Sequence, residues 1–220
     1  MKKYNPFFIH LLASFSLLGL LFLLQMGHSF WGFSIGQWGI RPGSISGLFG
    51  IFTAPFFHSD WIHLLSNSLP LFILLNVILN LYVHLAYWSL LGIVLLSGAG
   101  VWVLGSPASS HIGISGLIYG MIGFLLAAGI IGGSRNSLRI TFITALLYGG
   151  FVWGFLPRQG ISWESHLSGF LSGLLMALFF LKNVKDNEVH VSPAELEYAF
   201  FFEEVEKKGY HLPDDPPPHA

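Results

Sequence analysis

The feature that most constrains this chain is a series of six apolar stretches, each about as long as a helix that crosses a membrane. They cover residues 7–26, 62–81, 85–104, 114–131, 138–156 and 165–181. A helix needs about 20 apolar residues to span the hydrocarbon core, where only helices and closed barrels satisfy their backbone hydrogen bonds. The pattern therefore predicts an all-α, polytopic membrane protein with six transmembrane helices.

The charged residues divide the chain into two parts. Nine of the eleven acidic residues lie at or beyond Asp186, and few charges of either sign precede Leu181. We predict a six-helix membrane domain over residues 1–184 and a cytoplasmic acidic tail over residues 185–220. Ser-Pro-Ala-Glu at 192–195 is typical of a capping box, so we expect one short helix up to about Lys208 and a disordered, Pro-rich end.

The basic residues predict the orientation, since Lys and Arg favour the cytoplasmic side. With the N-terminus inside, six of them face the cytoplasm and two face outward: Lys2, Lys3, Arg135, Arg139, Lys182 and Lys185 against Arg41 and Arg158. We expect both termini in the cytoplasm of a bacterial cell, the first helix being retained in the plasma membrane because no small-residue cleavage site follows it. The net charge of −1 gives no indication of nucleic acid binding, and the absence of cysteine excludes thiolate metal sites.

Polar side chains near the start of the second, fourth and sixth stretches are the candidate functional residues. His63 and Asn67 begin the second, Ser115 begins the fourth and His166 begins the sixth. Even-numbered helices all enter from the outer side, so these residues share one depth. Polar residues inside membrane helices are costly and usually functional. His63 and Asn67 are four residues apart, as are Ser115 and Tyr119, which puts each pair on one helix face.

Glycines indicate that two of these helices approach closely. Pairs spaced four residues apart lie beside both candidates, at Gly116 and Gly120 and at Gly169 and Gly173, and Gly113 lies just before the first pair. Such small-residue faces let helix backbones nearly touch. We therefore predict that Ser115 lies within hydrogen-bond reach of His166, the geometry that activates a serine.

Other interpretations of these residues are open. A serine in a membrane helix usually bonds a carbonyl of its own helix, and four further histidines could simply lie at the membrane interface: His10, His28, His84 and His111. A metal site is a sharper alternative. However, His58 and His63 would point about 140° apart if both were helical, and the sequence has no cysteine to supply a thiolate ligand. We predict no metal and no cofactor.

Three motifs resemble those of the rhomboid intramembrane serine proteases. His58, His63 and Asn67 match the family's HxxxxHxxxN segment, residues 113–120 (GISGLIYG) are similar to GxSGxxYG, and residues 165–169 (SHLSG) are similar to the helix-6 histidine motif. The motifs occur in the correct order on the second, fourth and sixth helices. Arg41 takes the place of an arginine common in the first outer loop, whereas Ser165 stands where Ala or Gly is more usual.

The resemblance implies a fold, an activity and roles for individual residues. It implies a six-helix rhomboid-like bundle that hydrolyses transmembrane segments of membrane-protein substrates with a Ser115–His166 dyad. It assigns His63 and Asn67, with help from His58, to the oxyanion, and packs Tyr119 against the imidazole. The fifth helix resembles the family's proposed lateral gate, where Gly149, Gly150 and Gly154 could loosen its packing.

Two alternative functions are a catalytically silent rhomboid-like binder of membrane clients and a small transporter. A silent binder usually lacks the Ser or the His, and both are present. A transporter usually carries an intramembrane charge or paired broken helices, and neither pattern is found in the sequence. The expected partners are the lipid bilayer and transmembrane substrates, and the oligomeric state is left open.

Overall fold

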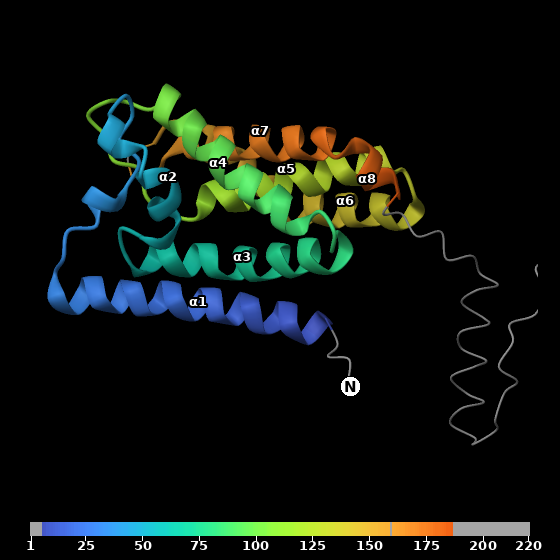
Figure 1. The fold of residues 1–220 in the computed structure, drawn as a ribbon, viewed down its shortest axis with the longest axis horizontal. Coiled ribbons are helices and arrows are strands. Elements are labelled where there is room, and N and C mark those ends of the chain that lie inside the picture. Colours follow the sequence, from blue (N-terminus) through green and yellow to red (C-terminus); the bar gives the residue numbers. More distant parts are fainter. Residues whose placement is uncertain (1–5, 159, 187–220) are drawn as a thin grey trace, which may run out of the picture. The chain divides into compact units, whose positions relative to one another are not determined.

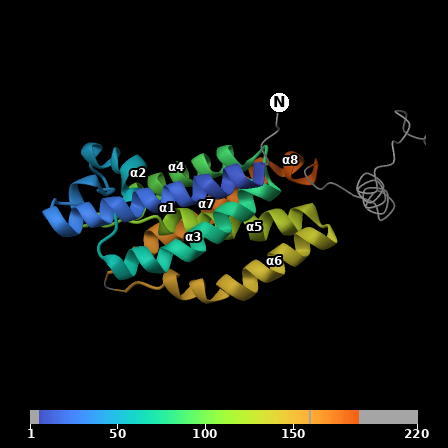
Figure 2. The same cartoon turned by 90° about the horizontal axis from the view of Figure 1, so that it is seen from below.

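The computed structural model describes residues 6–158 and 160–186, and within them the chain is helical, without a β-strand. Six elements carry most of the chain: α1 (Pro6–Trp31), α3 (Trp61–Leu81), α4 (Ala86–Leu104), α5 (Ser115–Gly132), α6 (Arg135–Tyr148) and α7 (Trp163–Phe179). These helices run roughly along one direction (Figures 1 and 2). Helix α1 lies beside α3 at the edge of the bundle (Figure 1). The all-α fold predicted from the sequence is confirmed.

Five helical segments in the described residues are long and apolar enough to cross a membrane, namely α1, α3, α4, α5 and residues 135–155. The sixth, α7, has 17 residues, or about 26 Å at 1.5 Å per residue. The fifth segment is not one continuous α-helix as the sequence predicted. It continues from α6 as the 3-10 helix η4 (Gly149–Phe155), because two consecutive glycines weaken the α-helix at this point.

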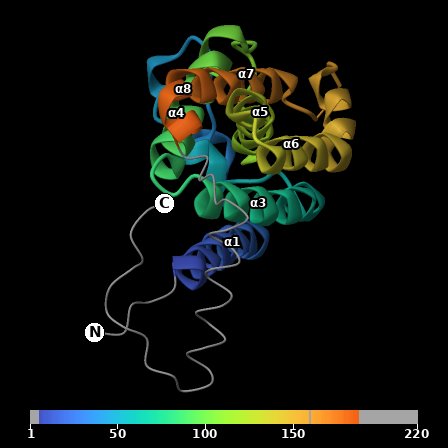
Figure 3. The ribbon, with the colours of Figure 1, turned by 90° about the vertical axis from the view of Figure 1, so that its right-hand side faces the viewer.

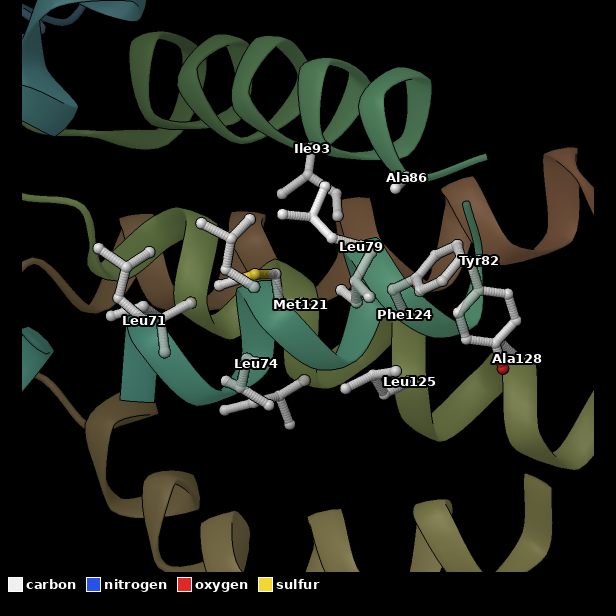
Figure 4. Close-up of a cluster of buried hydrophobic side chains, with 14 of the residues drawn as sticks. Leu71, Leu74, Leu79, Tyr82, Ala86, Ile93, Met121, Phe124, Leu125 and Ala128 are labelled. Carbon is white, nitrogen blue, oxygen red and sulfur yellow. The ribbon is translucent and has the colours of Figure 1, made fainter. Parts of the chain in front are cut away.

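Helix α5 is the centre of the bundle. It contacts α3, α4, α6 and α7, and these helices surround it when the molecule is seen end-on (Figure 3). Of its residues, 67% are buried. Leu71 and Leu74 of α3 and Ile93 of α4 pack with Met121 and Phe124 of α5 in one apolar cluster (Figure 4). The outward faces of the other spans carry exposed apolar side chains, as expected where lipid replaces water.

Helices α5 and α7 form the most extensive contact in the bundle, and glycine makes it possible. A Cβ on Gly169 would collide with the carbonyl of Gly116, and one on Gly173 with the carbonyl of Gly120. The two backbones therefore touch directly, as the small-residue spacing predicted. This close approach brings the first turns of the two helices, and the polar residues they carry, side by side.

The connection between α1 and α3 folds over the start of α5. It contains η1 (Gly36–Trp38), η2 (Ile45–Gly47), α2 (Gly50–Thr53) and η3 (Ala54–Phe56). Ile40 and His111 exchange two backbone hydrogen bonds of 2.9 Å, and the N–H of Gly113 donates to the carbonyl of Ala54 at 2.9 Å. This connection carries exposed apolar side chains, such as Ile45 and Phe49.

A short helix, α8 (Leu181–Asp186), follows α7. The tail predicted over residues 185–220, with its helix from Pro193 to about Lys208, lies outside the described residues except for Lys185 and Asp186.

Candidate active site

A cavity of about 900 Å³ opens at the end of the bundle where α3, α5 and α7 begin. Five of the residues singled out in the sequence line it: His63, Asn67, Ser115, Tyr119 and His166. They come from three helices that are far apart in sequence. The topological argument, in which even-numbered helices present their first turns at one depth, accounts for this arrangement.

Ser115 and His166 lie next to each other in the cavity wall. The Nε2 atom of His166 is 3.0 Å from the hydroxyl oxygen of Ser115. Ser115 is the first residue of α5, and His166 lies in the first turn of α7, which Ser162 caps by accepting from the N–H of Ser165. The loop before Ser115 turns at Gly113, whose φ of +113° is one that side-chain-bearing residues rarely adopt.

The imidazole of His166 is held on its other side by the 3-10 helix η4. Its Nδ1 atom is 2.8 Å from the carbonyl oxygen of Gly154. A carbonyl can only accept, so Nδ1 carries the hydrogen and Nε2 is left as an acceptor facing Ser115. The contact therefore fixes the tautomer that can receive the serine proton.

Tyr119 fixes the plane of the same imidazole. Its ring stacks on that of His166, with 4.1 Å between centroids and 8° between planes. Its hydroxyl donates to the carbonyl of Phe151 at 2.8 Å. The carbonyls of Phe151 and Gly154, which orient the rings of Tyr119 and His166, thus both belong to η4. A Cβ on Gly154 would collide with the Tyr119 hydroxyl, whereas Gly149 and Gly150 have open space around them.

Asn67 lines the cavity, and its side chain carries an unpaired donor. Its side chain is 8% exposed, and its amide nitrogen is buried without a hydrogen-bond partner among the residues that the structure describes. A buried donor left unpaired is costly, so such a group in a native fold calls for an explanation. An oxyanion in the cavity would supply an acceptor once the amide turns toward it, because the nitrogen is buried in this structure. The first N–H groups of α5, which no helical turn satisfies, begin at Ser115, which lines the same cavity.

His63 is less well arranged to donate. Its Nδ1 atom lies 3.2 Å from the hydroxyl oxygen of Ser59, and that hydroxyl donates to Asp60 at 2.7 Å. Ser59 therefore accepts from Nδ1–H, which leaves Nε2 of a neutral His63 as an acceptor. His63 can donate to an oxyanion through Nε2 only when it is charged.

His58 lies behind the cavity wall rather than in it. It is 1% exposed, and its Nε2 accepts from the N–H of Ile114 at 3.4 Å. Burial, with the nearby His63 as a second cause, lowers the pKa of His58 to about 3. The imidazole is therefore neutral and supports the backbone just before Ser115.

The expected divergence of His58 and His63 is wrong. Their rings meet edge to face with centroids 4.9 Å apart, because His58 lies in the non-helical segment between η3 and α3. Within residues 6–158 and 160–186, no group of three or more His, Cys, Asp or Glu side chains forms a metal-binding arrangement.

Three further residues named from the sequence have the following surroundings. Gly113 does not take part in helix packing: a Cβ there would lie 2.7 Å from Cε1 of His63, so it makes room for a side chain. Ser165 packs against Gly116, since a Cβ on that glycine would lie 2.6 Å from the Ser165 hydroxyl. Arg41 is not among the residues that line the cavity.

Two of the histidines expected at the membrane interface are buried in the bundle. His10 is 5% exposed and its Nδ1 lies 3.0 Å from Oδ1 of Asn80, between α1 and α3. His111 is 8% exposed and lines the cavity. Its position four residues before Ser115 was the only signal in the sequence, and nothing there identified its partners.

A helical bundle with five long apolar spans, a shorter sixth and a cavity at one end defines an integral, multi-pass membrane protein. Comparison with known proteins places it more narrowly. The Rhomboid domain model matches residues 45–183, and the chain belongs to the rhomboid family of intramembrane proteases.

Relatives are found in mycobacteria. The uncharacterized protein Rv1337 of Mycobacterium tuberculosis is 34% identical over 167 residues, covering 72% of this chain and 70% of the relative. The uncharacterized protein ML1171 of Mycobacterium leprae is 32% identical over 169 residues, covering 73% and 67%.

Proposed function

We propose that this chain is a serine endopeptidase that hydrolyses peptide bonds in or near the transmembrane segments of other membrane proteins. The observation that carries the proposal is the 3.0 Å contact between His166 Nε2 and the Ser115 hydroxyl. The Gly154 carbonyl, 2.8 Å from Nδ1, keeps the hydrogen on Nδ1, so Nε2 accepts the hydrogen bond from the Ser115 hydroxyl. A serine bonded to a base whose tautomer is fixed is the arrangement of an activated nucleophile.

Ser115 and His166 can carry out both steps of peptide hydrolysis, which are acylation of the serine and hydrolysis of the acyl-enzyme. As the Ser115 oxygen bonds to the substrate carbonyl carbon, its proton passes to Nε2 of His166. The tetrahedral intermediate then collapses, the C–N bond breaks, and His166 returns that proton to the departing amine. A water molecule deprotonated by His166 then attacks the acyl-enzyme, and the proton returns to Ser115 as the acid product leaves.

The negative charge on the substrate oxygen needs donors at the cavity wall. The unpaired amide of Asn67 and the N–H of Ser115, at the positive end of the α5 dipole, are the groups we assign. His63 is a weaker candidate, because Nε2 of its neutral ring is an acceptor and only the protonated ring can donate there. Tyr119 keeps the imidazole in plane, a role that a carboxylate shares in a triad.

The substrates we propose are transmembrane proteins that reach the cavity from the bilayer. The polar side chains of the cavity support access of the water that hydrolysis consumes. The distribution of Lys and Arg supports cytoplasmic termini and a cavity on the outer side. Bacterial relatives support location in a bacterial plasma membrane.

A fluorophosphonate probe tests the proposal, because it reacts with serines activated by a base. The purified chain in detergent should be labelled, and both Ser115→Ala and His166→Ala should abolish labelling. Ser66→Ala is the matched control: Ser66 also lines the cavity, but its hydroxyl donates to the carbonyl of His63 at 2.9 Å. It should label at the wild-type rate.

Each outcome separates the candidate functions. A folded wild-type chain that stays unlabelled would indicate a silent binder or a transporter, and wild-type labelling of His166→Ala would remove the base from the mechanism. Chelators should leave labelling unchanged, since the proposed chemistry uses no metal. Release of a fluorescent ectodomain from a model transmembrane substrate in liposomes, lost in Ser115→Ala, tests the substrate class.

A further inference from the structure

His111 occupies a junction between three segments at the outer end of the bundle. It lies in the loop between α4 and α5, four residues before Ser115. Its backbone pairs with Ile40 through two hydrogen bonds of 2.9 Å. Its side chain reaches across to Ser162, with 2.6 Å between Nδ1 and the hydroxyl oxygen.

The direction of the hydrogen bonds around His111 follows from their partners. The hydroxyl of Ser109 donates to the carbonyl of Ser106 at 2.6 Å, and its oxygen lies 2.7 Å from Nε2 of His111. Ser109 must therefore accept from Nε2–H, which leaves Nδ1 to accept from the Ser162 hydroxyl. Burial lowers the pKa of His111, which favours the neutral imidazole that this pattern requires.

Ser162 connects this bridge to the catalytic base. It is the N-cap of α7, and its hydroxyl oxygen accepts from the N–H of Ser165. Its carbonyl accepts from the N–H of His166 at 3.2 Å. The bridge thus joins a residue four positions before Ser115 to a residue four positions before His166.

We propose that His111 is a positioning residue that clamps the starts of α5 and α7 together and so sets the separation of Ser115 and His166. The inference rests on the proposed protease function. The glycine faces of α5 and α7 bring the backbones together, and Tyr119 stacks on His166 between them. The segments that lead into the two helices are joined by the hydrogen bond between His111 and Ser162, which fixes the relative position of the two helix starts at the cavity end. A misplacement of about 1 Å costs roughly a hundredfold in rate.

The experiment measures the inactivation of the full-length chain by a fluorophosphonate, separating the rate constant kinact from the binding constant KI. His111→Ala and Ser162→Ala should each lower kinact by roughly tenfold to a hundredfold and leave KI unchanged. The double variant should lose no more than the more affected single variant, because both remove one interaction. Ser110→Ala is the matched control, since the Ser110 hydroxyl bonds the carbonyl of Gly36 instead.

A conservative variant separates positioning from loop packing. His111→Asn keeps an acceptor near the Nδ1 position and should recover most of kinact, and it also serves if His111→Ala fails to fold. Unchanged kinact in His111→Ala, or additive losses in the double variant, overturns the clamp. Failure of His111→Asn to recover activity overturns the acceptor role. An unlabelled wild type overturns the protease proposal itself, whereas a labelled wild type with unaffected variants overturns the clamp alone.

Discussion

Gly154→Ala is the perturbation that most directly tests how the imidazole is held. Gly154 supplies the carbonyl that accepts from His166 Nδ1. The added methyl group would collide with the Tyr119 hydroxyl and lie 2.9 Å from Nδ1 of His166. Relief requires that Tyr119, His166 or η4 move. Each of these shifts weakens a contact that orients the base.

The magnitude follows from the size of the required shift. Carbon atoms approach nitrogen or oxygen at about 3.0–3.4 Å at the closest, so the overlap forces a displacement on the order of 1 Å. Such a displacement costs roughly a hundredfold in the rate of the chemical step. Overpacking of this kind also lowers the free energy of unfolding by about 1–3 kcal/mol.

Gly150→Ala is the matched control on the same 3-10 helix. No atom lies within 4 Å of the position a Cβ would occupy there, and Gly150 is not among the glycines with positive φ. Alanine should therefore leave fluorophosphonate labelling unchanged and stabilise the fold slightly. The assay compares labelling rates and Tm for both variants in detergent. If Gly154→Ala labels as fast as wild type, η4 does not hold the base, and this account of the site is wrong.

Three further predictions follow from other parts of the molecule. Asn67→Ala should lower turnover by roughly a hundredfold to a thousandfold. It should not lower Tm, because the amide nitrogen has no partner among the described residues. Asn76→Ala, which loses a 2.9 Å hydrogen bond to Ser14, should lower Tm and leave turnover unchanged. The pKa of His58 is about 3 in the folded chain and about 6.5 in the unfolded chain, so the unfolded chain binds more protons between these pH values. The free energy of unfolding should therefore fall by about 2 kcal/mol from pH 7 to pH 5. If the Tm of His58→Gln depends on pH as the wild-type Tm does, this prediction is wrong. Truncation after Lys185 should leave cleavage of a model substrate intact, and lost activity with normal membrane insertion would show that the tail supports the fold.

Much of the fold was predictable because membrane helices follow simple physical limits. Apolar length located the spans within a few residues, apart from the first helix, which continues to Trp31. Because every second span enters the membrane from the same side, the sequence predicted that the starts of α3, α5 and α7 lie at one depth. Glycine spacing predicted the contact of α5 with α7. These predictions needed only hydropathy, chain direction and small-residue packing.

The partners of the site residues could not be predicted in the same way. The Gly154 carbonyl faces His166 because the chain forms a 3-10 turn there, and no side-chain motif records the direction of a carbonyl. The tautomer of His63 depends on Ser59 and Asp60, whose hydrogen bonds form only once α3 has started. The link from His111 to Ser162 spans 51 residues and requires the finished bundle.

The Gly154 carbonyl shows how the imidazole of a Ser–His pair can be oriented without an acid. In a triad the carboxylate selects the tautomer, holds the ring and stabilises the imidazolium. Here a backbone carbonyl selects the tautomer and Tyr119 holds the ring. Neither brings a net charge into the bundle, where an ion is expensive to bury. The third task, stabilising the imidazolium, then falls to the dipole of the Gly154 carbonyl and to the carboxylate of Glu164, which lines the same cavity and acts on His166 through space.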